Sequence, residues 1–213
     1  MSSSITAISP QKKNRGRCNI FVDGEYAFSL SEKIAASLQV GAVLTPEEKQ
    51  RLLHEDEKQK AFDRCLHYLR YRPRSRAEII GYLEKKGFSG PAVQNALSRL
   101  ESYGYIDDKS FARMWIESRC RSRPRGEFAL RHELRQKGVD EAIIDQMLTD
   151  FEETGPAWRA VAPRLSAWAK LDRPALKQKF YQYLNRRGFS WETCQTVWTQ
   201  ALAFLDTQAE KKY

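Results

Sequence analysis

The chain has 213 residues, with 36 Lys and Arg against 27 Asp and Glu, which gives a formal net charge of +9 at pH 7. Its 41% of hydrophobic and 11% of aromatic residues exclude a disordered chain, and its length allows one or two ordinary domains. No stretch approaches the roughly 18 apolar residues that a membrane span needs, and the first residues lack the apolar core of a secretion signal.

The first 44 residues are predicted to form a small N-terminal β-hairpin segment. Asp23 and Gly24 separate two alternating runs, and this dipeptide is typical of a two-residue hairpin turn. Residues 5–8 are expected to add a third strand, and residues 31–38 a short helix. The alternation places four apolar side chains on one face of the hairpin: Phe21, Tyr26, Phe28 and Leu30.

A charged helical connector is expected over residues 45–59. Thr45, Pro46 and Glu48 have the spacing of a capping box with proline at the first helical position, so a helix should begin there. We expect this helix to lead towards the repeats that follow.

Three similar segments of 16 residues follow, each running from an Arg-Pro dipeptide to a glycine: 72–87, 123–138 and 173–188. The final glycines lie 51 and 50 positions apart. This periodicity predicts three tandem units, at 60–108, 109–155 and 156–206, followed by a polar tail at 207–213.

The repeated residues predict three short helices in each unit. Gly87, Gly138 and Gly188 suit the left-handed residue that ends a helix, and each Arg-Pro is expected to separate the first helix from the second. The fold class is therefore mainly α: three tandem three-helix repeats in an elongated, curved array, preceded by the small β segment.

The sequence contains no recognisable catalytic or metal-binding pattern. His54 and His132 each precede a glutamate but lack a second histidine four residues later, and Asp107-Asp108 is better explained as a helix N-cap. We therefore expect no enzyme, no metal and no cofactor. The four cysteines are far apart, which favours reduced side chains in a cytoplasmic protein: Cys18, Cys65, Cys120 and Cys194.

Two arginine clusters occupy equivalent positions in the first two repeats. Guanidinium groups bind phosphate and carboxylate oxygens in a bidentate manner, so the clusters suit a strand or filament that runs along the repeats. A solvated basic turn is the alternative. The neighbouring tyrosines could stack on nucleic-acid bases or pack against other side chains of the protein. The candidate binding residues are Arg70, Arg72, Arg74, Arg76, Arg119, Arg121, Arg123, Arg125, Arg131 and Arg135, with Tyr68 and Tyr71 for stacking.

These motifs resemble the RecX family of regulators of the RecA recombinase. The matching residues are 68–78 (YLRYRPRSRAE), 83–88 (LEKKGF), 104–108 (GYIDD) with Phe111-Ala112, 123–126 (RPRG) and 134–138 (LRQKG). The third repeat departs from the pattern, since Ala175-Leu176 replaces the Arg-Ser and Arg-Gly of the first two.

The resemblance implies binding along the groove of the RecA–single-stranded DNA filament, with inhibition of strand exchange and of the filament's ATP hydrolysis. We expect the protein to be a monomer. The resemblance also implies a role in DNA recombination, DNA repair and the SOS response. The alternative is a general single-stranded nucleic-acid-binding protein of helical repeats without a dedicated protein partner.

Overall fold

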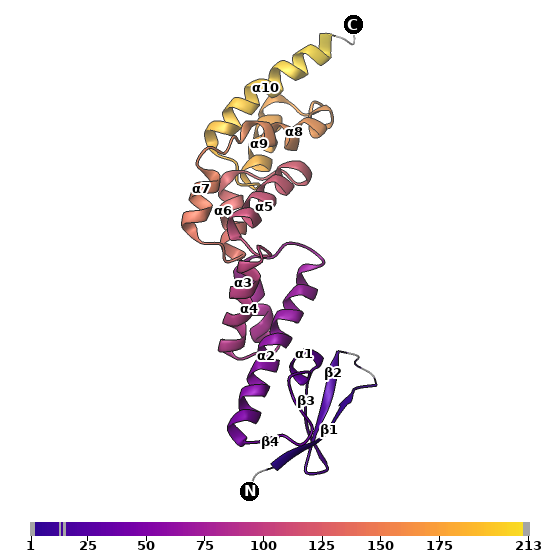
Figure 1. Ribbon diagram of the computed structural model, residues 1–213. Coiled ribbons are helices and arrows are strands. Elements are labelled where there is room, and N and C mark those ends of the chain that lie inside the picture. Colours follow the sequence, from indigo (N-terminus) through magenta and orange to yellow (C-terminus); the bar gives the residue numbers. More distant parts are fainter. Residues whose placement is uncertain (1–2, 13, 15, 211–213) are drawn as a thin grey trace. The chain divides into compact units, whose positions relative to one another are not determined.

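The computed structural model describes residues 3–12, 14 and 16–210 and contains two compact units. The first unit comprises Met1–Arg74 and Glu78–Ile106, and the second comprises Ser75–Ala77 and Asp107–Tyr213. The predicted fold class is confirmed in its elements, since the described residues form an N-terminal sheet followed by three sets of three helices (Figure 1). None of the described helices is long and apolar enough to cross a lipid bilayer.

The N-terminal sheet is antiparallel, with the strand order β3-β2-β1-β4. Its strands are β1 (Ser3–Pro10), β2 (Arg17–Val22), β3 (Glu25–Ser31) and β4 (Val43–Leu44). The predicted hairpin is confirmed: Asp23 and Gly24 link β2 to β3 and both have positive φ, at 52° and 87°. The predicted third strand is β1, whereas β4 was not predicted because it has only two residues.

The predicted shared face of Phe21, Tyr26, Phe28 and Leu30 is wrong for the pair Phe21 and Tyr26, which lies outside the apolar cluster of the sheet. A register shift between Ile20 and Phe21 pairs Phe21 with Tyr26 but Ile20 with Phe28, and Tyr26 is 58% exposed. The core side of the hairpin is instead made by Ile20 and Leu30, both fully buried, together with Phe28. A bulge of this kind turns side chains to new directions, and simple alternation cannot anticipate it.

A long helix follows the sheet. After the short α1 (Glu32–Ala35), α2 runs over Pro46–Leu69, so the predicted connector and the first helix of the first repeat are one continuous helix. The predicted capping box is confirmed, since Thr45 Oγ1 accepts from the Glu48 amide and the Glu48 carboxylate accepts from the Thr45 amide.

One buried carboxylate joins α2 to the sheet. Asp56 is 1% exposed and accepts hydrogen bonds from the Arg17 guanidinium and from the Ser31 amide, and it pairs with Lys60 at 2.7 Å. Burial alone would raise the pKa of Asp56, but these hydrogen bonds outweigh it and hold the pKa below its usual value.

The first repeat continues with α3 (Arg76–Lys85) and α4 (Gly90–Ser102). Its core lies among α3, α4 and the second half of α2. Ile79, Leu83 and Leu97 are fully buried there beside Cys65.

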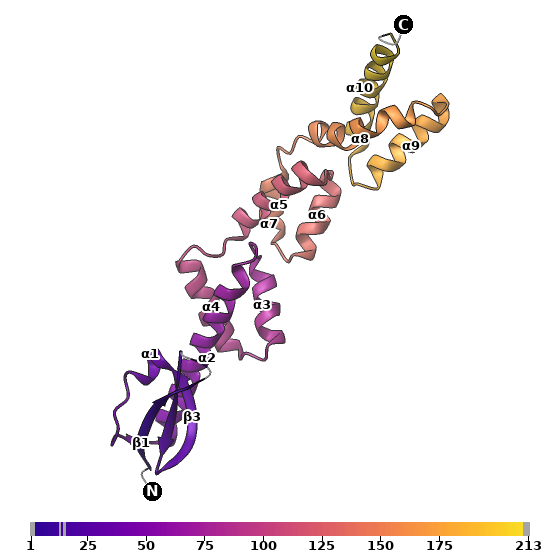
Figure 2. The ribbon, with the colours of Figure 1, turned by 90° about the vertical axis from the view of Figure 1, so that its right-hand side faces the viewer.

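The second unit holds the other two repeats (Figure 2). Their helices are α5 (Asp108–Ser122), α6 (Glu127–Gln136) and α7 (Glu141–Leu148), then α8 (Thr154–Trp168), α9 (Arg173–Asn185) and α10 (Trp191–Glu210). Each set surrounds its own apolar cluster. Asp107 caps α5 through the amides of Lys109 and Ser110, as predicted.

The third Arg-Pro dipeptide differs from the prediction. Arg173 is the first residue of α9 and Pro174 follows it inside the first turn, so this dipeptide starts a helix instead of separating two helices. The Asp172 side chain accepts from the Ala175 amide and caps the helix one residue earlier. Proline is compatible with the first turn, where its missing N–H would have no helical partner.

The three repeat glycines end α3, α6 and α9 with positive φ of 81°, 70° and 76°, as predicted. Their surroundings differ. A Cβ on Gly87 would meet nothing, whereas a Cβ on Gly188 would overlap Ala129 at the start of α6. Gly188 therefore serves both as a helix end and as a point of close approach of the third repeat to the second.

The two positions offer a matched test. We expect Gly87→Ala to cost about 1 kcal/mol, because only the left-handed backbone is penalised. Gly188→Ala should cost at least about 2 kcal/mol more, because overlap with Ala129 is added. Urea unfolding of both variants measures the difference, and equal losses would contradict the close approach.

Candidate functional site

The first arginine cluster lies between α2 and α3, and its members have different partners. Arg72 donates from both terminal nitrogens to the Glu78 carboxylate, at 3.0 and 2.8 Å. Arg70 is exposed at the C-cap of α2 and has no acidic partner among the described residues. Arg76 is exposed at the start of α3.

Arg74 is held by aromatic rings. Its guanidinium carbon lies 3.8 Å from the centre of the Tyr68 ring, and Tyr68 stacks on Tyr82 at 4.1 Å with an interplanar angle of 8°. Both faces of Tyr68 are therefore covered. Tyr71, the other predicted stacking residue, is 74% exposed and contacts His67 edge to face.

In the second cluster, ion pairs with Glu133 stand where the first cluster has stacked side chains. Arg119 Nε donates to Glu133 Oε2 at 2.6 Å, and Arg125 Nε lies 3.5 Å from Glu133 Oε1. Trp115 Nε1 also donates to Glu133, at 2.8 Å. With the offset of 51 residues, Arg119, Arg125 and Glu133 correspond to Tyr68, Arg74 and Tyr82 of the first repeat. The same three positions therefore fix both helix junctions, one by stacking and one by ion pairing.

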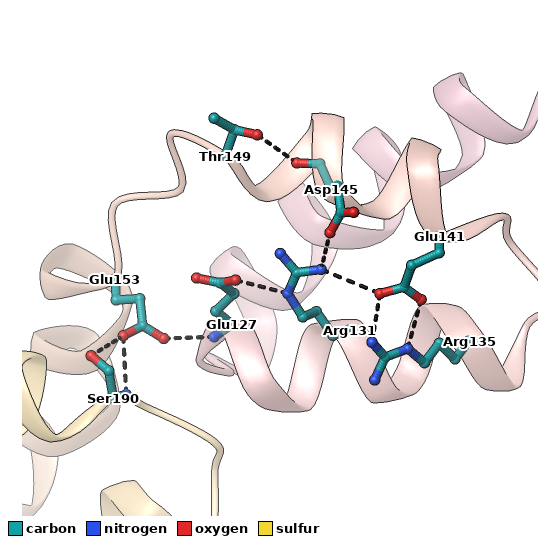
Figure 3. Close-up of polar contacts among 8 residues, drawn as sticks. All are labelled: Glu127, Arg131, Arg135, Glu141, Asp145, Thr149, Glu153 and Ser190. Atoms are coloured by element: carbon teal, nitrogen blue, oxygen red, sulfur yellow. Dashed lines mark hydrogen bonds and ion pairs between the residues drawn. The ribbon is translucent and has the colours of Figure 1, made fainter.

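Arg131 and Arg135 project from α6 into an acidic cluster (Figure 3). Arg131 pairs with Glu127 and Asp145, and Arg135 donates from two nitrogens to Glu141. The hydrogen bond from Arg135 holds the pKa of Glu141 below its usual value. The charge of these two arginines is thus largely matched within the protein.

Seven of the predicted arginines fall into two groups. Arg72, Arg119, Arg131 and Arg135 are engaged by carboxylates, whereas Arg70, Arg121 and Arg123 are exposed and have no acidic partner among the described residues. The second group can take an anion without first losing an ion pair.

Sequence reasoning missed three arginines that lie close to the second cluster. Arg159 and Arg164 of α8 and Arg187 after α9 line a pocket of about 440 Å³ together with Arg123 and Arg125. The third Arg-Pro segment gives little indication of a basic site, because Ala175 stands where the first two segments have Arg74 and Arg125. Arg159 and Arg164 lie in α8, outside the repeated 16-residue segments.

The described residues contain no group of three His, Cys, Asp or Glu side chains placed to hold a metal ion. The buried Cys65 and Cys194 thiols have pKa values raised by burial to about 12 and about 11. Thiols in this state are poor nucleophiles.

Four family models of RecX match the chain. They are the regulatory protein RecX N-terminal domain over residues 3–44 and the first, second and third three-helix domains over 61–100, 107–148 and 160–198. The regulatory protein RecX of Bacillus subtilis (strain 168) is 34% identical over 98% of this chain and 81% of its own length. The protein of the same name from Lactobacillus delbrueckii subsp. bulgaricus is 34% identical over 97% of this chain and 78% of its own length.

Solved structures agree. A crystal structure of regulatory protein RecX superimposes with a TM-score of 0.73 at 28% identity, covering 92% of this chain and 98% of that one. RecX from Lactobacillus salivarius, at 19% identity and a TM-score of 0.64, shares the fold over 69% of this chain and 97% of its own. The chain belongs to the RecX family of regulatory proteins.

Two neighbouring arginines of α5 test the division into arginines engaged by carboxylates and open arginines, which are exposed and have no acidic partner among the described residues. Arg119→Gln should lower the free energy of unfolding by about 1–2 kcal/mol, because Glu133 loses a charge-assisted hydrogen bond. Arg121→Gln should change it by less than about 0.5 kcal/mol, because an exposed side chain without an acidic partner is removed. Thermal and urea unfolding measure both, and an equal loss would contradict the division.

Proposed function

We propose that the protein regulates the RecA recombinase by binding in the groove of RecA–single-stranded DNA filaments. Its main effect is inhibition of strand exchange and of the filament's ATP hydrolysis. Membership of a family whose curated members are named regulatory protein RecX supports a regulatory role. The protein acts in the cytoplasm as a monomer, without catalytic residues or a cofactor, in DNA recombination, DNA repair and the SOS response.

One observation, besides membership of the family, supports binding to a filament. Arg70 and Arg121 occupy equivalent positions in successive repeats, 51 residues apart, and both are exposed without an acidic partner among the described residues. Cations repeated at equivalent positions suit a target that is itself periodic, such as a protein filament wound on DNA. Each repeat then bridges neighbouring recombinase protomers through several weak contacts, whose effects multiply because they are linked.

The second candidate is a general single-stranded nucleic-acid-binding protein without a dedicated protein partner. The exposed ring of Tyr71 beside the first arginine cluster is compatible with it, because aromatic rings stack on bases. This candidate acts only by occupying free DNA.

An ATPase titration separates the two functions. RecA filaments are formed on single-stranded DNA with ATP, and the protein is then added at far below one copy per recombinase. We expect ATP hydrolysis to fall at these substoichiometric amounts, because few bound copies interrupt a cooperative filament. If hydrolysis falls only when the protein is sufficient to cover the DNA, the second candidate is correct.

A pair of variants links the effect to the open arginines. Arg70→Gln with Arg121→Gln should weaken inhibition, whereas Arg113→Gln with Lys177→Gln removes the same charge from other exposed positions and should not. Equal inhibition by both double variants would dismiss the assignment of the open arginines.

A further inference from the structure

Five arginines from two repeats surround one pocket in the second unit. Arg123 and Arg125 come from the segment between α5 and α6, Arg159 and Arg164 from α8, and Arg187 follows α9. Tyr183 of α9 also lines the pocket, whose volume is about 440 Å³.

Neutral groups hold three of these arginines in place. Arg164 Nε donates to the Tyr183 hydroxyl at 2.8 Å, and the guanidinium carbons of Arg164 and Arg187 lie 4.8 and 4.6 Å from the centre of the Tyr183 ring. Arg187 also donates to the Pro124 carbonyl at 3.2 Å, and Arg159 donates to the Cys120 carbonyl at 3.3 Å. These contacts orient the side chains but cancel none of their charge.

The pocket therefore keeps a strong positive charge. Among the described residues the five arginines have one acidic partner, Glu133, which lies 3.5 Å from Arg125 and is shared with Arg119. Like charges around one pocket repel each other, and an anion placed between them removes that cost. Each guanidinium has five N–H donors, so donors remain for a ligand after the contacts described above.

We propose that this pocket binds the phosphate groups of a single-stranded DNA backbone. A nucleic-acid strand carries one negative charge per nucleotide, so adjacent phosphates can occupy several arginines at once, whereas a peptide does so only where acidic residues run together. Arginine forks suit phosphate oxygens in particular. This inference extends the proposed function and depends on it only for the choice of single-stranded DNA as the polyanion.

The pocket also gives the third repeat a role in DNA contact. At the equivalent break this repeat keeps Arg173 but has Ala175 where the first two repeats have Arg74 and Arg125. Its cations come instead from α8 and from Arg187, and they meet the second arginine cluster at the junction of the two repeats.

Direct binding without the recombinase tests the pocket. The full-length protein is titrated into a fluorescent single-stranded oligothymidylate, and the affinity is followed by anisotropy over a series of salt concentrations. For single strands the slope of log K against log salt is about −0.7 per phosphate contact, so Arg123→Gln with Arg159→Gln should reduce its magnitude by about 1.4. Arg113→Gln with Lys177→Gln removes the same charge from exposed positions outside the pocket and should change the slope much less.

Two further binding measurements, with an abasic strand and with lysine variants, identify the ligand. An abasic strand of the same length should bind about as well as the oligothymidylate, because the contacts go to the backbone, and Arg123→Lys with Arg159→Lys should restore most of the salt slope. Circular dichroism confirms that each variant is folded.

Three results would overturn the proposal: no binding of the oligonucleotide by the parent protein, an equal loss in both glutamine variants, or tighter binding of a polyglutamate peptide than of the strand. None of these would change the filament ATPase result, so failure of the pocket and failure of the recombinase proposal remain distinguishable.

Discussion

The carboxylate of Glu153 is buried among hydrogen-bond donors from two repeats, and the arrangement of the second unit depends on it. It accepts from the Glu127 amide at the start of α6 and from the Ser190 amide and hydroxyl before α10 (Figure 3). Beside it, the amides of Gly126 and Phe128 donate to the carbonyls of Arg187 and Gly188. The first amides of a helix have no acceptor inside that helix. For the first amides of α6, the acceptors are the Glu153 carboxylate and the carbonyls of Arg187 and Gly188.

This junction determines which charges come together. It brings the segment carrying Arg123 and Arg125 beside α8 and the end of α9, whose arginines complete the pocket. In the first two repeats a trio of side chains lies at the helix break, with Tyr68, Arg74 and Tyr82 stacked in the first repeat and Arg119, Arg125 and Glu133 ion-paired in the second. Structural partners thus occupy some arginines and leave others available for an anion.

The sequence predicted the helices well because their signals are local. Gly188 and the capping box at Thr45 act through their own backbone, so periodicity and cap residues were sufficient. Tyr26 was misplaced because a bulge in its own strand, β3, leaves Ala27 without a partner in β2 and changes the register without any sequence signal. The arginine pocket was missed for a related reason: Arg159 and Arg164 lie outside the repeated segment, and only the packing of α8 brings them to Arg123.

Our central claim is that the second and third repeats form one fixed body that holds the arginine pocket. Hydrogen exchange of the amides of Gly126, Glu127 and Phe128 tests it most directly, because these protons can be protected only through the junction. We predict protection comparable to that of the Leu134 amide in the middle of the repeat. Exchange as fast as in an unfolded chain would show that the two repeats move independently, and the claim would be wrong.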